Sequence, residues 1–317
     1  MIPARLLAGV ATVFAVVTAG CGFGPGDSSE GEATIRVTRD YGSQSMVEAS
    51  VSDPTESDTV IRGLDSEADI TTRYGGGFVQ SIEGLAGGIE GGRSFDWFFY
   101  VNGIESRIGA ADVPLHGGDR IWWDYHDWSD VMRVPAVVGS WPEPLAQLSA
   151  GEDRVPVRVE CADRESTCDD VLEQLATEGV AAGVKDFGRA QQTGPEAMRV
   201  LVGTWARLRA DGAAAQMERG PAQSGVFASF KHTGSGWSLT VLGPDAEPAA
   251  RVGRHAGLIA AVREGEEPPT VLIAGTDEAG VESAVEVLEP AELRDRYALA
   301  VGPDGAVPAP LVEGGSP

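Results

Sequence analysis

Residues 120–128 read RIWWDYHDW and place one histidine and two aspartates among four aromatic side chains. Asp124, His126 and Asp127 are of the types that bind metal ions. Alternate side chains of a strand point to opposite faces, so Asp127 would point away from the other two and leave only two ligands. We therefore expect a solvated polar edge here instead of a metal site. One alternative stays open, in which His126 contacts a metal atom that belongs to a bound ligand.

The same alternation divides the aromatic residues of this strand, and of an earlier one at residues 96–103 (DWFFYVNG), into two faces. One face carries the aliphatic residues and is the expected core: Trp97, Phe99, Val101, Ile121, Trp123 and Tyr125. The other face mixes rings with polar groups: Phe98, Tyr100, Trp122, Asp124 and His126. Exposed aromatic clusters commonly mark binding sites, which favours a ligand surface on this second face. An equal alternative is that another domain packs there and buries it.

Catalytic motifs are absent from the sequence. The histidines at 116, 126, 232 and 255 occur without an HExxH motif, and no GxSxG motif is present. The turns VGTW at 202–205 and AGTD at 274–277 could present backbone amides to an anion, but each has one glycine where phosphate loops have several. We expect no enzyme activity and no cofactor.

The amino-acid composition is typical of a globular protein with a strong negative charge. The 317 residues are long enough for two domains with cores of their own, and 42% are hydrophobic. Acidic residues number 48 and basic residues 24, which gives a formal charge of −24. Such a charge repels nucleic acid phosphates, so nucleic acid is not an expected partner.

The N-terminus resembles a bacterial lipoprotein signal. One arginine, Arg5, precedes an apolar run at residues 6–17 that is too short to span a bilayer. Small residues then lead to Cys21, the expected lipidation site, which would hold the mature protein outside the cell, anchored to the membrane. The alternative is an ordinary signal peptide with an incidental cysteine. Residues 22–33, rich in glycine, serine and acidic residues, are the expected spacer.

Two further cysteines, Cys161 and Cys168, remain for the folded part. An even pair in an oxidising compartment predicts a disulfide, which would close a short loop between a strand and a helix. Their spacing differs from the CxxC of redox motifs.

Residue patterns divide the folded part into two domains. Short strands and one helix, with Val60, Ile61 and Leu64 on its buried face, predict an α+β domain over 34–128. A proline-containing connector follows at 129–150. Apolar strands alternating with helices then predict a small mixed α/β domain of unknown role over 151–301, with a flexible tail at 302–317.

The first of these domains resembles a known family. Its ordered motifs are FVQSIEGL from Phe78, Trp97 within DWFFYVNG, GAADVP at 109–114, and GGDRIWW. They resemble the C-terminal domain of the cobalamin carriers transcobalamin and intrinsic factor, and more closely its bacterial relatives, the DUF4430 group. The resemblance implies a β-grasp-like fold with a ligand surface outside the cell. It also implies that Phe78 and Gln80 lie on the ligand side, along with the second aromatic face. The helical barrel that completes the carriers' site is absent from this chain.

These observations together predict a lipid-anchored extracytoplasmic protein that binds a small ligand, a corrinoid such as cobalamin, for a membrane transporter. The rings of Phe98, Tyr100 and Trp122 would stack on the ligand, while Asp124 and His126 would orient it. The alternative is a protein-interaction module whose aromatic face docks a separate helical-barrel subunit or a transporter protein.

Overall fold

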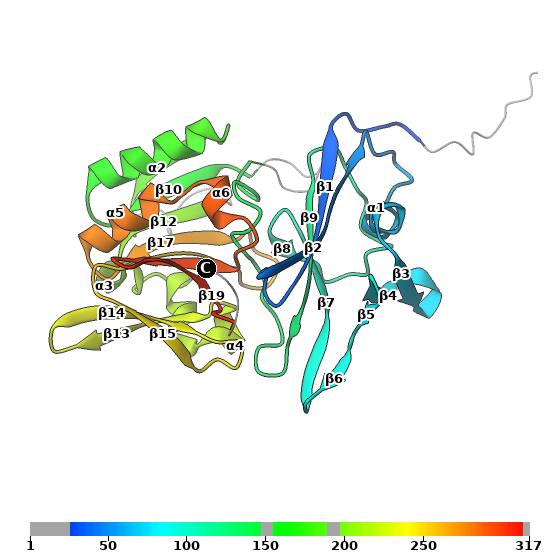
Figure 1. Cartoon of the computed structure of the whole chain (residues 1–317). Coiled ribbons are helices and arrows are strands. Elements are labelled where there is room, and N and C mark those ends of the chain that lie inside the picture. The colour runs from blue at the N-terminus through cyan, green and yellow to red at the C-terminus, as the bar shows by residue number, and fades with distance from the viewer. Residues whose placement is uncertain (1–25, 147–154, 189–196, 313–317) are drawn as a thin grey trace, which may run out of the picture.

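A computed structural model describes residues 26–146, 155–188 and 197–312 of the chain. It shows a mixed α/β protein, with much more strand than helix, in two domains that lie side by side (Figure 1). The expected signal sequence with Cys21 and the last five residues of the expected tail lie outside the described residues. Within the described ranges, no helix is both long enough and apolar enough to cross a membrane.

The N-terminal domain is built on a six-stranded sheet of order β2-β1-β9-β7-β6, with β8 paired to β7. All neighbouring pairs are antiparallel except β1 and β9, which run parallel. The strands of this sheet are β1 (Glu32–Arg39), β2 (Gln44–Ser52), β6 (Gly88–Glu90), β7 (Arg93–Val101), β8 (Ile104–Glu105) and β9 (Arg120–Asp127). A small second sheet contains β3 (Ile70–Arg73), β4 (Phe78–Ile82) and β5 (Leu85–Ala86), with the short helix η1 (Tyr74–Gly76) between its first two strands.

Helix α1 (Val60–Glu67) and the small sheet lie on the outer side of the six-stranded sheet, away from the second domain (Figure 1). Between them is the domain's own core, which includes the apolar residues Val60, Ile61 and Leu64 of α1. It also contains the whole face that the sequence predicted to be core: Trp97, Phe99, Val101, Ile121, Trp123 and Tyr125. The division of the aromatic residues into two faces is therefore confirmed.

The C-terminal domain has a seven-stranded sheet of order β11-β10-β12-β17-β16-β18-β19. Its first four strands are parallel and the last three are antiparallel to their neighbours. These strands are β10 (Val157–Cys161), β11 (Ala182–Asp186), β12 (Met198–Thr204), β16 (Gly257–Val262), β17 (Thr270–Gly275), β18 (Ala298–Gly302) and β19 (Gly305–Ala309). A separate antiparallel sheet is formed by β13 (Ala228–Thr233), β14 (Gly236–Leu242) and β15 (Pro248–Gly253).

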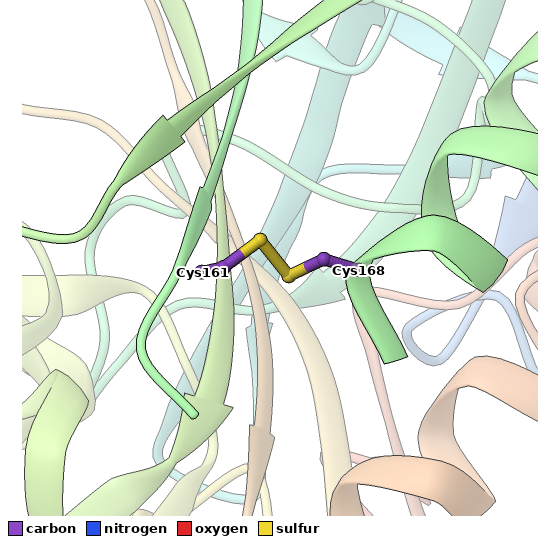
Figure 2. Close-up of a disulfide and its surroundings, with 2 residues drawn as sticks. All are labelled: Cys161 and Cys168. Carbon is purple, nitrogen blue, oxygen red and sulfur yellow. A yellow bond between two sulfur atoms is a disulfide. The ribbon is translucent and has the colours of Figure 1, made fainter. Parts of the chain in front are cut away.

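Helices α2 (Glu165–Thr177) and α5 (Glu278–Glu286) cover one face of the seven-stranded sheet, and the three-stranded sheet lies on the other side (Figure 1). Short helices complete the domain: α3 (Trp205–Leu208), η3 (Ala214–Arg219), α4 (Pro221–Ser224) and α6 (Pro290–Leu293). The predicted disulfide between Cys161 and Cys168 is present and joins the end of β10 to the first turn of α2 (Figure 2).

Three predicted boundaries differ from the structure. Strand β1 begins at Glu32, and Ser29 already bonds to Pro54, so the end of the expected spacer belongs to the folded domain. Residues 305–309 of the expected tail form β19, which pairs with β18 and is the edge strand of the sheet. The connector is packed as well, since Val134, Val137 and Trp141 are almost fully buried. The described part of the connector has no regular secondary structure, but its apolar side chains pack between the two domains.

Candidate functional site

The second aromatic face of the N-terminal sheet is covered by the C-terminal domain. Tyr100, Trp122 and Asp124 are completely buried and His126 is 2% exposed, while Phe98 is half-buried. Tyr297, which comes just before β18, packs edge-on against Trp122 and His126 at ring-centre distances of 5.1 and 5.6 Å. The expectation of a solvated polar edge is therefore wrong. Of the two alternatives for this face, the structure shows the one in which another domain buries it.

Asp124 is the centre of a hydrogen-bonded network within this interface. Its carboxylate accepts bonds from the backbone amides of Tyr41 at 3.1 Å and Gly42 at 2.9 Å. It also accepts from the hydroxyls of Thr38 at 2.5 Å and Tyr297 at 3.1 Å, and it lies 2.9 Å from Nδ1 of His126. A buried carboxylate is tolerated only when its charge is well bonded, and here both oxygens have several partners.

The imidazole of His126 is held between two rings. Phe98 stacks on one side and Tyr41 on another, each with a ring-centre distance of 4.5 Å. Burial raises the pKa of the Tyr41 and Tyr297 hydroxyls above the ordinary tyrosine value, and nearby carboxylates including Asp124 raise it further. Both tyrosines therefore keep their protons and act as hydrogen-bond donors at neutral pH.

The carboxylate of Asp127 does not join this network, as the strand alternation predicted, although its backbone carbonyl accepts a hydrogen bond from the Tyr41 hydroxyl. Its carboxylate bonds instead to Arg93 and to the amide and hydroxyl of Ser129, at 3.0 and 2.6 Å. Among the described residues, no group of three or more histidine, cysteine, aspartate or glutamate side chains could hold a metal ion.

Beside the buried interface, an open cleft of about 460 Å³ lies between the two domains. Tyr41 and Phe95 supply aromatic walls from the N-terminal domain, and Leu311 and Val312 supply an aliphatic wall from the end of the described chain. The remaining lining residues are the charged Asp40, Arg93 and Asp127 and a segment that runs from the turn before β15 into the start of that strand: Gly243, Pro244, Asp245, Glu247, Pro248 and Ala249. This combination of apolar walls with a few polar groups is typical of small-ligand sites, which often lie between domains.

Comparison with known protein families identifies part of the N-terminal domain. A family model described as a domain of unknown function, DUF4430, matches residues 57–127. The chain contains a DUF4430 domain. The matched residues include α1, β7 and β9 but exclude β1 and β2, so Tyr41 of the cleft lies outside them. No curated protein matches the chain.

Within the DUF4430 domain, Phe78 and Gln80 lie apart from the other predicted ligand residues. Both are on β4 of the small outer sheet. Phe78 is 39% exposed and contacts the ring of Tyr74, which is 87% exposed, at a centre distance of 6.4 Å. Gln80 accepts a hydrogen bond from Arg73 at 2.6 Å. The seven predicted residues therefore form two groups, one buried between the domains and one on the outer surface.

A second cavity, of about 720 Å³, borders the domain interface near β2 and α6 and contains three arginines. Each of them already contacts an acceptor. Arg36 pairs with Asp295 at 2.6 Å and Arg294 pairs with Glu48, so both ion pairs join the N-terminal domain to the C-terminal domain. Arg120 donates to the backbone carbonyl of Trp141 at 3.0 Å. All three arginines are thus already bonded, and Arg36 and Arg294 link the two domains. The cavity therefore presents little positive charge that is available to a ligand.

Tyr41, Phe95 and Tyr297 were not among the residues predicted from the sequence. Tyr41 follows Asp40 in a turn where both residues have positive φ, at 58° and 56°, a conformation that side chains other than glycine adopt rarely. That strain was not visible in the sequence. The pairing of Tyr297 with Asp124 spans 173 positions, so no local pattern could have revealed it.

Proposed function

We propose that this protein is a non-catalytic, extracytoplasmic binding protein that holds a small ligand in the cleft between its two domains. The observation that carries the proposal is the cleft itself, with the aromatic walls of Tyr41 and Phe95 beside a fully packed interface. Because Tyr41 also packs against His126 and Tyr297, the wall of the cleft is held by the contacts that join the domains. A ligand would thus meet a preformed surface, which lowers the entropic cost of binding.

Location outside the cell, with lipid attached at Cys21, is part of the proposal. It rests on the lipoprotein-like signal before Cys21 and on the disulfide between Cys161 and Cys168, since such bonds persist mainly in oxidising compartments. An anchored binding protein would pass its ligand to a transporter in the same membrane. A β-grasp-like fold for the N-terminal domain is supported by α1, which packs on one face of a mixed sheet in which β1 and β9 are parallel neighbours.

The burial of Tyr100 and Trp122 limits the size of the ligand that we propose. A corrinoid stacked on Tyr100 and Trp122 would require the domains to separate, because both side chains are completely buried. The cleft volume of about 460 Å³ is in the lower half of the range for small-ligand pockets and suits a ligand of ordinary metabolite size. We therefore propose a ligand smaller than a corrinoid, and cyanocobalamin serves as a comparison compound.

Native mass spectrometry of the soluble protein tests this function. The protein from residue 26 onward is incubated with the small-molecule fraction of bacterial culture medium, and with cyanocobalamin separately, and retained masses are recorded. Ala249→Trp places a large ring in the cleft from an exposed position on β15. Ala222→Trp, at an exposed position on α4 away from the cleft, is the matched control. We expect a retained small molecule that Ala249→Trp abolishes and Ala222→Trp does not; retention unaffected by either variant would refute the proposal.

A second function, protein docking, is favoured by one observation on the outer sheet. Tyr74 and Phe78 form an exposed ring pair on the side of the DUF4430 domain away from the cleft. Exposed aromatic pairs are enriched where proteins meet. Cross-linking in intact cells would test this role: a protein captured by the parent chain and lost with Tyr74→Ser/Phe78→Ser supports it, and unchanged capture excludes this surface.

A further inference from the structure

The residues that line the interdomain cleft carry an excess of negative charge. Four carboxylates line it, from Asp40, Asp127, Asp245 and Glu247, against the single cation Arg93. Arg93 is held by two carboxylates, those of Asp127 and Asp130, so its charge is already balanced. The excess of negative charge in the cleft therefore comes from Asp40, Asp245 and Glu247.

Two of these three carboxylates, those of Asp40 and Asp245, are held at the cleft by local structure. Asp245 Oδ1 accepts the backbone amide of Glu247 at 3.1 Å, which holds the turn before β15. Asp40 accepts a hydrogen bond from Gln44 at 2.9 Å, and the guanidinium of Arg39 lies 3.6 Å away. Arg39 thus balances part of the charge of Asp40, whereas Asp245 and Glu247 are exposed on the opposite, C-terminal wall.

The aromatic walls fit the same kind of ligand. One face of each ring is already stacked on a neighbour, Tyr41 on His126 and Phe95 on Tyr125, and the exposed parts of the rings offer apolar surface for the body of a ligand. Tyr41 is 5% exposed at the base of the cleft and Phe95 is half-buried beside it. A formal charge of −24 on the whole chain would also draw cations toward the protein.

We propose that the cleft binds an organic cation, a small molecule with an amine or quaternary ammonium group on an apolar body. The apolar body would contact Tyr41, Phe95 and Leu311, while the cationic group would face Asp245 and Glu247. This inference rests on the proposed binding function and adds the chemical class of its ligand. Neutral or anionic molecules of the same shape would bind more weakly, because they gain nothing from the carboxylates or are repelled by them.

Three probes with one aromatic body and different charges test the inference: 2-phenylethylamine, 2-phenylethanol and phenylacetate. Their affinities for the soluble protein are measured by ligand-observed NMR, with Ala249→Trp to identify binding in the cleft. We expect the amine to bind about fivefold more tightly than the alcohol, and phenylacetate to bind most weakly. Asp245→Asn/Glu247→Gln should bring the amine and alcohol to within about twofold of each other.

The control is Asp169→Asn/Glu173→Gln, which removes the same amount of charge from exposed positions on α2. If the preference for the amine depends on the cleft carboxylates, this control variant should still bind the amine more tightly than the alcohol. A preference that survives in the cleft variant, or equal binding of all three probes that Ala249→Trp abolishes, overturns the inference and leaves the proposed function standing. Binding of every probe that is indifferent to Ala249→Trp counts against both.

Discussion

The hydroxyl of Tyr297 in the C-terminal domain donates a hydrogen bond of 3.1 Å to the carboxylate of Asp124 in the DUF4430 domain. Both side chains are almost fully buried. The same hydroxyl lies 3.0 Å from Nδ1 of His126. A polar network of this kind favours one orientation of the two domains, because a shift would take the Tyr297 donor away from a buried carboxylate.

Tyr297→Phe should therefore destabilise the protein. Removing the hydroxyl leaves the ring in place but takes one donor from a buried carboxylate, which costs about 1–3 kcal/mol. Urea unfolding measures the change, and Tyr74→Phe, at a site 87% exposed, is the control and should change stability by less than about 0.5 kcal/mol. Equal effects of the two variants would contradict the role given to the network.

Trp122→Ala tests whether the indole of Trp122 stabilises the fold or contacts the ligand. Because the indole is completely buried, its removal should cost about 3–5 kcal/mol in unfolding free energy. At a temperature where the variant is folded, its affinity for a cleft ligand should stay within about twofold of the parent, since Trp122 does not line the cleft. A large loss of affinity with little loss of stability would instead support the aromatic face as the ligand site.

The disulfide should contribute measurable stability. Cys161 and Cys168 are seven positions apart, and a loop of that size restricts the unfolded chain by about 2 kcal/mol. Cys161→Ser/Cys168→Ser should lower the urea midpoint accordingly, without changing ligand binding, because neither residue lines the cleft. The single variants give a comparison, and a midpoint unchanged in the double variant would show that the bond adds nothing.

Asp211 should link stability to pH. Burial pushes its pKa upward, but hydrogen bonds from Arg199 at 2.7 and 3.2 Å and the arginine charge outweigh burial and hold the pKa below the ordinary aspartate value. A lowered pKa contributes stability that is present above about pH 4 and is lost as the pH falls further. Asp211→Asn should lose about 2–3 kcal/mol at pH 7, and the difference from the parent should shrink below pH 4. Asp169→Asn is the exposed control, and a difference independent of pH would contradict the assignment.

Local periodicity predicted the elements of both domains. Alternation assigned Trp97, Trp123 and Tyr125 to the core, and helical spacing placed Val60 and Leu64 inside. Cysteine counting predicted the bond between Cys161 and Cys168, and the strand-turn-helix pattern after Val200 and Val271 matches β12 with α3 and β17 with α5. These features depend on neighbours within a few residues, which a sequence displays directly.

The partner of the second aromatic face could not be predicted in the same way. A set such as Tyr100, Trp122 and His126 has the composition of a binding surface whether the partner is a ligand or another domain. What decided the question was Tyr297, whose position depends on the packing of a seven-stranded sheet. The cleft was missed for the same reason, since its walls come from Asp40–Tyr41, Phe95, residues 243–249 and the last described residues.

Chemical-shift mapping tests the central claim, that a small ligand binds between the domains, most directly. The isotope-labelled soluble protein is titrated in turn with 2-phenylethylamine, 2-phenylethanol and phenylacetate, and backbone amide shifts are followed by NMR. The shifts should gather at Asp40, Tyr41, Phe95 and residues 243–249, with residues 72–80 unaffected. Shifts confined to residues 72–80, or no saturable shift in the cleft with any probe, would contradict it.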